Sequence, residues 1–158
     1  MGYIVIIVGE SGKKTVFYGQ KELTLDDKYR LVLPSIYRDG FTESTCFATL
    51  GMDKCVQLFP KETFEKNASE IMKLSEFSKE ARDVRRIFMG NTFNIPIDSH
   101  NRILLPKLLM NKVSLGKKVV VVGVYDHLEV WDMEAYYASE KEGEENYSES
   151  AKKLLGEK

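Results

Sequence analysis

The sequence repeats itself once, and this internal repeat constrains the fold more than any other feature. When 22–64 is aligned with 94–136, at a constant offset of 72 residues and without gaps, one pattern recurs. The identical pairs are Asp26 with Asp98, Arg30 with Arg102, Leu33 with Leu105, Pro34 with Pro106, Gly51 with Gly123, and Glu62 with Glu134. Two copies are too few for a solenoid, which needs at least about three. We therefore expect two half-complete units that finish one core together, as the subunits of a dimer do.

The composition is that of an ordinary globular chain. Its 158 residues carry a net charge of −1, with 43% apolar and 30% charged residues, so bulk charge does not by itself indicate nucleic-acid binding. The longest apolar stretch, 3–8, is far shorter than the about 20 residues that span a bilayer, and no membrane partner is expected. Cys46 and Cys55 lie in apolar segments without zinc-ligand spacing. They are interpreted as small buried side chains of a cytosolic protein, with no metal site.

Residues 1–15 precede the repeats and contain a segment, 9–15, that invites comparison with a phosphate-binding loop. A P-loop needs a glycine five positions before its Gly-Lys pair, where this chain has Ile7, and Ser or Thr after the lysine, where it has Lys14. We therefore expect no nucleotide cofactor and no small-molecule substrate. Residues 1–15 are interpreted as a non-family leader that is disordered or was added ahead of the natural start. A nucleotide-using enzyme is the weakest of three alternatives.

Each repeat follows one plan, a ββαββα unit. Two short strands flank a turn, proline then marks the start of a short helix, and a hairpin and a closing helix follow. The expected segments are a first repeat at 16–67, a bridging helical region at 68–91, a second repeat at 92–137, and an acidic tail at 138–158. The tail is polar and is expected to fray. A second bridging helix is predicted near 76–89, because Phe77, Ala81, Val84 and Phe88 have helical spacing.

The repeated loop is the segment that can carry chemistry. Its pattern, Asp-x-x-x-Arg-apolar-x-Leu-Pro, occurs at 26–34 and 98–106. Two strands joined at this spacing bring the aspartate and the arginine to the base of one turn. The pair can be structural, with the carboxylate capping backbone donors and fixing the guanidinium. It can equally hold the arginine for an outside phosphate or guanine edge. The residues themselves leave both readings open.

A catalytic interpretation finds little support, so no enzyme is expected. Asp26 and Asp27 are adjacent carboxylates, but the aligned partner of Asp27 is Ser99. His100 and His127 have no spaced nucleophile or acid beside them, and His127 is expected to be exposed at a hairpin end. The remaining notable side chains are interpreted structurally. Aromatic residues are assigned to the core (Phe59, Phe64, Trp131, Tyr136, Tyr137), and arginines of the bridging helix to an ion-pair lattice (Arg82, Arg85, Arg86).

Several motifs in a fixed order resemble those of the MraZ family. These are the tandem Asp-x-x-x-Arg loops, Phe-Tyr-Gly at 17–19, the linker at 84–90, and the final hairpin at 123–132. The resemblance covers 16 to about 140. It implies a mainly β fold with added helices, in which two tandem SpoVT-AbrB units interlock as a swapped-hairpin, double-split β-barrel. It also implies a ring-shaped homo-oligomer that binds direct repeats in promoter DNA.

The resemblance further implies a cytoplasmic, nucleoid-associated transcriptional regulator, a repressor, of the bacterial cell-division and cell-wall gene cluster. Carried over to this sequence, Asp26 and Asp98 would orient the loops. The implied DNA-contacting residues are Lys28, Arg30, Arg38, His100, Asn101, Arg102 and Lys107. Tyr29 departs from the family, since many members have glycine there, and His100 and Asn101 stand where lysine or glycine is common. The alternative function is an AbrB-type antitoxin-like or architectural module that binds a protein partner.

Overall fold

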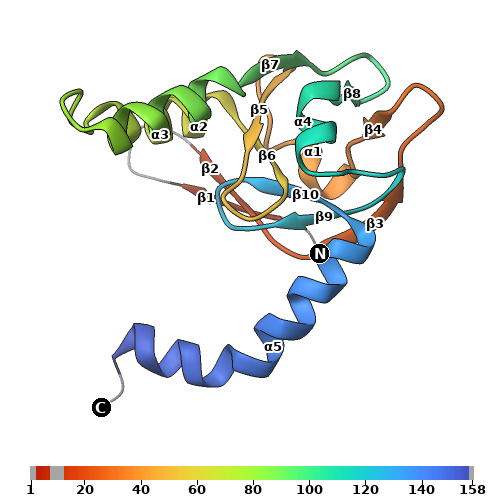
Figure 1. The fold of residues 1–158 in the computed structure, drawn as a ribbon. Helices are drawn as coiled ribbons and strands as arrows, with labels where there is room; N and C mark the ends of the chain where they lie inside the picture. Colours follow the sequence, from red (N-terminus) through yellow and green to blue (C-terminus); the bar gives the residue numbers. More distant parts are fainter. Residues whose placement is uncertain (1–2, 8–12, 157–158) are drawn as a thin grey trace.

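The structure, a computed structural model, describes residues 3–7 and 13–156, and its centre is built of strands to which helices are added (Figure 1). The strands are β1 (Tyr3–Ile7), β2 (Lys13–Phe17), β3 (Gln20–Thr24), β4 (Arg30–Val32), β5 (Thr45–Leu50), β6 (Val56–Phe59), β7 (Phe93–Pro96), β8 (Arg102–Leu104), β9 (Lys118–Gly123) and β10 (Leu128–Asp132). The helices are α1 (Ser35–Arg38), α2 (Lys61–Met72), α3 (Lys79–Gly90), α4 (Lys107–Lys112) and α5 (Met133–Leu155). The prediction of a mainly β fold with added helices is confirmed.

The two repeats exchange strands. One sheet has the order β3-β9-β10-β6-β5-β7, all antiparallel, so that β3 of the first repeat pairs with β9 of the second. In return, β7 of the second repeat pairs with β5 of the first. The ends of this sheet, β3 and β7, continue through tight turns into β4 and β8, which pair with each other as a separate two-stranded ribbon. Each repeat thus completes the other, as the internal repeat predicts.

Equivalent residues of the two repeats face each other at two places. In the β6–β10 pair, Gln57 lies opposite Glu129, and in the β4–β8 pair, Leu31 lies opposite Ile103. Both pairs join residues that are 72 positions apart, so an approximate twofold axis passes through both strand pairs. The covalent chain therefore has the internal symmetry of a dimer.

The gap-free alignment is wrong by one residue over β5 and β9. Gln57 pairs with Thr49, whereas its equivalent Glu129 pairs with Val122, 73 positions further along. The cause is visible at the hairpin ends. The Gly51 N–H donates to the Cys55 carbonyl, but the Val124 N–H donates to the His127 carbonyl, so the first connection is one residue longer.

Gly123 is consequently not the equivalent of Gly51, contrary to the alignment, because its strand position matches that of Leu50. A separate requirement keeps glycine at this position. A Cβ atom at Gly123 would lie 2.4 Å from the backbone nitrogen of Tyr18, closer than atoms can approach. The Gly123 N–H donates to the Gly19 carbonyl at 2.8 Å. The missing side chain lets the segment before β3 cross the end of β9.

The core lies between the sheet and the β4–β8 ribbon. Leu31 and Ile103 point into it from the ribbon and are 0% and 1% exposed. Cys46 and Cys55 are buried free thiols, as predicted, and burial raises the pKa of Cys46 to about 12. Of the aromatic residues assigned to the core, Phe59, Phe64 and Trp131 are buried. Tyr136 is half-buried and Tyr137 is exposed, so the core assignment of Tyr137 is wrong. No helix among the described residues is long and apolar enough to cross a membrane.

The bridging region is a pair of helices, α2 and α3, that lie side by side at one end of the molecule (Figure 1). The second helix begins at Lys79, later than predicted, because the Ser78 hydroxyl caps it by accepting from the Ala81 N–H. Phe77 therefore lies ahead of the helix and is 97% exposed. The predicted ion pairs are present for Arg85 and Arg86, whereas Arg82 donates to the Glu76 carbonyl at 2.8 Å. Asp83 contacts Lys79 and Arg86, and Glu76 contacts Arg85, at 2.8–3.3 Å.

Both ends of the chain differ from expectation. Instead of a disordered leader, β1 pairs antiparallel with β2 over 3–7 and 13–17, while residues 8–12 of the P-loop-like segment lie outside the described residues. Instead of a frayed tail, α5 is one helix from Met133 to Leu155 that projects away from the sheet (Figure 1). The Asp132 carboxylate caps it, and Glu, Lys and Ala, which favour helix, supply much of its length.

Candidate nucleic-acid interface

The first repeated loop is a tight hairpin built around one carboxylate. The chain turns at Asp26, whose carbonyl accepts from the Tyr29 N–H at 2.9 Å, and closes with the Asp26 N–H donating to the Arg30 carbonyl at 3.1 Å. One carboxylate oxygen, Oδ1, accepts from the N–H groups of Lys28 and Arg30, both at 2.9 Å. The other, Oδ2, accepts from the Arg30 Nε at 2.7 Å. Asp26 thus fixes both the turn and the guanidinium.

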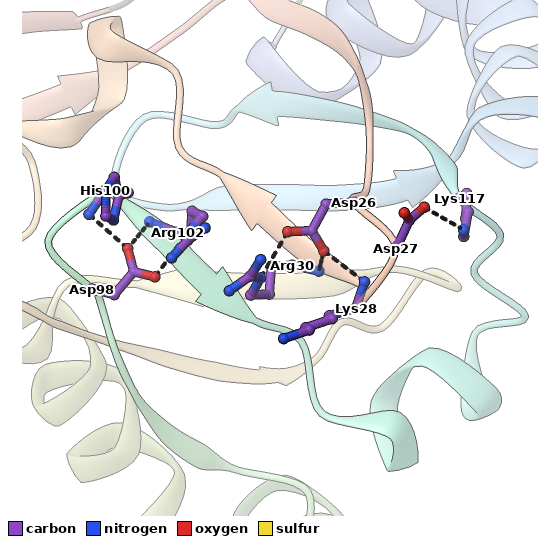
Figure 2. A network of polar contacts seen from close by, with 8 residues as sticks. All are labelled: Asp26, Asp27, Lys28, Arg30, Asp98, His100, Arg102 and Lys117. Carbon is purple, nitrogen blue, oxygen red and sulfur yellow. Dashed lines mark hydrogen bonds and ion pairs between the residues drawn. The ribbon is translucent and has the colours of Figure 1, made fainter.

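The second loop repeats this arrangement (Figure 2). The Asp98 Oδ1 atom accepts from the N–H groups of His100 and Arg102 at 2.8 and 2.9 Å, and its Oδ2 atom accepts from the Arg102 Nε at 2.8 Å. The Asn101 N–H donates to the Asp98 carbonyl at 2.9 Å, matching the Tyr29 bond of the first loop. The structure therefore brings each predicted orienting aspartate onto its predicted arginine.

Both aspartates are held in their charged form. The backbone N–H of Arg102 is the largest cause that lowers the pKa of Asp98, to about 2, and burial opposes it in part. The Arg102 side chain, the His100 N–H and the arginine's charge lower it further. The Arg30 N–H likewise lowers the pKa of Asp26. A charged carboxylate that accepts three hydrogen bonds is a rigid support for an arginine.

The guanidinium groups of the two arginines are only partly engaged by the residues that the structure describes. Each uses Nε for its aspartate, and in the part of the chain that the structure describes neither donates a hydrogen bond from Nη to a protein acceptor. The side chains of Arg30 and Arg102 are 27% and 28% exposed. The two Nη groups of a guanidinium form a planar fork that matches the oxygens of a phosphate or the N7 and O6 edge of guanine. Each loop can therefore present a pre-oriented fork to an outside ligand.

The β4–β8 ribbon brings the two forks to one face. Arg30 lies opposite Leu104, and Val32 lies opposite Arg102. Residues directly opposite each other, and residues two apart along a strand, point to the same side of a sheet. These four side chains therefore share the outward face, while Leu31 and Ile103 point into the core. Figure 2 shows the two arginines lying between the two aspartates.

The hydrogen bonds around each aspartate form a frame that is the same in both loops, whereas the side chains at the loop tips differ. Tyr29 and Asn101 both adopt left-handed backbone conformations, with φ of 60° and 61°. This conformation explains why a glycine suits the position, and asparagine tolerates it better than tyrosine does. Lys117 lies 5.4 Å from the centre of the Tyr29 ring and 3.6 Å from the Asp27 carboxylate. The first loop is therefore braced by a lysine from outside its repeat unit.

The other predicted contact residues are less uniform. Lys28 and Lys107 are exposed and line the same shallow hollow beside Tyr29 and Leu104. The Arg38 Nε donates to the Leu33 carbonyl at 2.8 Å, so this side chain is partly engaged at the end of α1. His100 is exposed in the second loop, and the Asn101 carbonyl accepts from the Leu33 N–H at 2.9 Å.

Sequence reasoning did not single out Lys117, Val32 or Leu104. Lys117 lies far from Asp27 in sequence. Val32 and Leu104 have the apolar character that is usual for strand residues. A signal for the pair was available, because alternation along Arg30–Val32 places the residue two positions after each arginine on the arginine's own side. It is the structure that shows Val32 and Leu104 exposed, at 45% and 58%.

His127 is not exposed, contrary to the sequence interpretation. Its side chain is 13% exposed, stacks on Phe59 at 4.8 Å between ring centroids, and places Nδ1 2.7 Å from the Asp126 carboxylate. Burial lowers its pKa, but the carboxylates of Glu129 and Asp126 outweigh this and raise it. No nucleophile is paired with it among the residues that the structure describes, and no cluster of potential metal ligands occurs within them. We interpret the histidine as a structural group.

The fold and the site define a class: a two-repeat β protein in which paired Asp–Arg hairpins are displayed on one ribbon. The MraZ protein family model, whose description adds the words antitoxin-like, matches 16–87 and 88–158. The chain belongs to the MraZ family. It is 32% identical over 139 residues to the transcriptional regulator MraZ of Mesoplasma florum, covering 88% of this chain and 95% of that protein. The regulator MraZ of Bifidobacterium longum is 31% identical over 147 residues, covering 93% and 97%.

Proposed function

We propose that this chain is a transcriptional regulator that binds double-stranded DNA in a sequence-specific manner through the outward face of the β4–β8 ribbon. The observation that carries the proposal is the pair of arginine forks, Arg30 and Arg102. Each is fixed by an aspartate, and among the residues that the structure describes no protein acceptor engages its outer nitrogens. The names of its relatives, transcriptional regulator MraZ, support the regulatory role.

A two-stranded ribbon is a suitable element for reading DNA, because the major groove admits one. An arginine that donates to N7 and O6 of guanine is the commonest specific contact there. The aspartates hold the forks before the DNA arrives, so that less side-chain freedom is lost on binding. Lys28, exposed beside the first fork, and Lys107, exposed at the start of α4, supply charge for the phosphate backbone. His100 and Asn101 in the second loop, and Arg38 at the end of α1, are proposed as further DNA contacts.

The near-neutral chain can bind DNA tightly if several copies act together. We propose a ring-shaped homo-oligomer that engages successive direct repeats in a promoter. Linked sites raise overall affinity by roughly 10²–10⁴ without new contacts. In this proposal the target is the promoter of the cell-division and cell-wall gene cluster, the effect is repression, and the protein acts in the cytoplasm at the nucleoid. The role is that of a binding protein and needs no cofactor.

The second candidate is an antitoxin-like or architectural module that binds a protein. The specific observation in its favour is the hollow at the bridging helices, which is lined by the exposed apolar side chains Met72, Phe77 and Met89, at 38%, 97% and 45% exposure. A chain of this kind would use the Asp–Arg hairpins only to stabilise its own fold.

The deciding experiment titrates duplexes that carry one, two, three or four direct repeats of the promoter ahead of its own gene. It compares the wild type with Arg30→Ala at two salt concentrations. Arg86→Ala, which removes an exposed arginine from α3, is the matched control. We expect affinity to rise with repeat number, to fall steeply with salt as counterions are released, and to collapse in Arg30→Ala alone. Affinity that is indifferent to repeat number and to Arg30 would favour the protein-binding module.

A further inference from the structure

Two apolar side chains occupy the exposed ribbon between the arginine forks. Val32 and Leu104 are 45% and 58% exposed, although their neighbours Leu31 and Ile103 are almost fully buried. In register, Leu104 lies opposite Arg30 and Val32 lies opposite Arg102. The outward face of the ribbon is therefore a two-by-two arrangement in which each fork has one apolar neighbour across the ribbon and another along its own strand.

Single exposed apolar residues are common and need no explanation. This pair differs because it recurs at equivalent positions of both repeats and because cations surround it. Lys28 and Lys107 line the hollow that reaches Leu104, and the two arginine forks lie on the same face. An apolar pair flanked by cationic side chains suits a partner that carries anionic groups beside a small apolar group. That chemistry favours DNA over an apolar protein surface.

We propose that Val32 and Leu104 contact the C5-methyl groups of thymines that neighbour the guanines read by Arg30 and Arg102. The thymine methyl is the apolar group that base edges present in the major groove, and apolar side chains recognise it by contact. This inference rests on the proposed function and adds to it a second base and the residues that select it.

The spacing of the ribbon restricts where these thymines lie. Directly opposite side chains have Cβ atoms about 4.5–5.5 Å apart, and positions two apart along a strand are separated by about 6.6 Å. Base pairs rise by about 3.4 Å each. Each apolar side chain thus falls within one or two base pairs of its neighbouring fork. The approximate twofold relation of β4 and β8 predicts two such guanine–thymine steps in each bound site.

The test uses DNA rather than protein variants as its first probe. A duplex that binds the full-length protein is selected from a random pool, and each thymine is then replaced by uracil, which lacks only the methyl group. We expect uracil to weaken binding about fourfold at each contacted position, the effect of one buried methyl group. Two replacements should weaken it about 16-fold. Thymines outside the contacted steps should tolerate uracil.

Protein variants then assign the effect to residues. Val32→Ala and Leu104→Ala should bind the thymine and uracil duplexes with nearly equal affinity. Val124→Ala, which trims an exposed valine away from the ribbon, is the matched control and should keep the wild-type preference for thymine. Thermal unfolding of each variant checks that the fold is retained.

The outcomes separate this inference from the proposal beneath it. If Arg30-dependent binding is found but uracil changes nothing at any position, the methyl contact is overturned and the regulator stands. If no duplex is recovered from the pool, both are overturned. If Val32→Ala or Leu104→Ala alters the oligomer's mass and leaves the thymine preference intact, the pair belongs to a subunit contact and the inference is also overturned.

Discussion

The two Asp–Arg hairpins agree in frame and differ in tip. Their matching hydrogen bonds differ by at most 0.1 Å in length, from the carboxylate to the turn and to the arginine Nε. Their tips differ in charge and shape. The first has Lys28 and Tyr29, with Lys117 close by, and the second has His100 and Asn101.

This difference separates two tasks within one motif. The frame positions a guanidinium, and it tolerates no variation between the repeats because the same carboxylate holds the turn and the fork. The network uses only the backbone N–H groups of the tip residues, so the side chains at the tips are free to differ. We therefore expect the two loops to place their arginines equally well but to contribute unequally to binding, with the first loop stronger because Lys28 adds a second cation.

The largest expected effect is the loss of one fork. Arg30→Ala should weaken DNA binding by about 5-fold to 150-fold, the range expected for one bidentate arginine contact. Arg102→Ala should weaken it less, and Arg30→Lys should recover only part of the loss because lysine keeps the charge without the fork. Titration of one promoter duplex with all three variants measures this order. A larger loss from Arg102→Ala would reverse the assignment of the stronger loop.

The second-largest effect is expected when an aspartate of the frame is replaced, and it should appear in how the stability of the protein depends on pH. A carboxyl whose pKa is lowered by folding stabilises the protein above its unfolded pKa, and the benefit is lost as pH falls toward the folded value. For Asp98 that window runs from about 4 down to about 2. Asp98→Asn should lower the unfolding temperature at neutral pH, and its deficit should shrink across the window. Asp26→Asn should behave in the same direction. An equal deficit at all pH values would mean that charge does not matter to the frame.

A smaller effect should distinguish the two loop tips, namely how steeply the affinity for DNA falls with salt concentration. Lys28→Ala should reduce the slope of log affinity against log salt by about 0.9, the value for one lost phosphate contact. His100→Ala should change the slope less than Lys28→Ala does. Lys152→Ala, near the end of α5, is a control for a lysine remote from the ribbon. Equal slopes for the first two variants would remove the electrostatic distinction between the loops.

The smallest effect concerns the left-handed residues. Tyr29→Gly relieves backbone strain of about 1–2 kcal/mol but loses about 0.5–1 kcal/mol to chain entropy and a similar amount from the Lys117 contact. We expect a change within about 1 kcal/mol in the free energy of unfolding. Asn101→Gly should stabilise less or destabilise, because asparagine already tolerates this conformation. Urea denaturation of both variants measures the difference, and a large loss in Tyr29→Gly would show that its ring is essential.

The sequence was sufficient for the frame because the frame is local. Asp26 and Arg30 are four residues apart with turn-forming residues between two strand-like segments, so they meet across a tight turn, and the repeat shows that the arrangement is used twice. The exchange of strands also followed from the repeat. The burial of His127 could not be predicted from the neighbouring sequence, because the aromatic ring that stacks on it belongs to Phe59 on another strand.

The one-residue shift over β5 and β9 could not be read from the sequence either. Gly51 and Gly123 align as identical turn residues, and the competing requirement that Gly123 admit the backbone of Tyr18 is a tertiary contact. The length of α5 was missed for a different reason. Its polar, acidic composition predicts fraying, whereas glutamate and lysine are themselves good helix formers.

The exchange of strands has a consequence for how the protein is made. Synthesis proceeds from the amino terminus, so β5 and β6 emerge before their partners β7 and β10 exist. At about 5–20 residues per second, the ribosome needs roughly 3–13 s to deliver the second repeat. During that interval the first repeat has unpaired edges, which are sites of aggregation. Joining two repeats in one polypeptide keeps the missing strands tethered nearby. The edges of the first repeat are therefore paired within the same chain and do not depend on an encounter with a separate molecule.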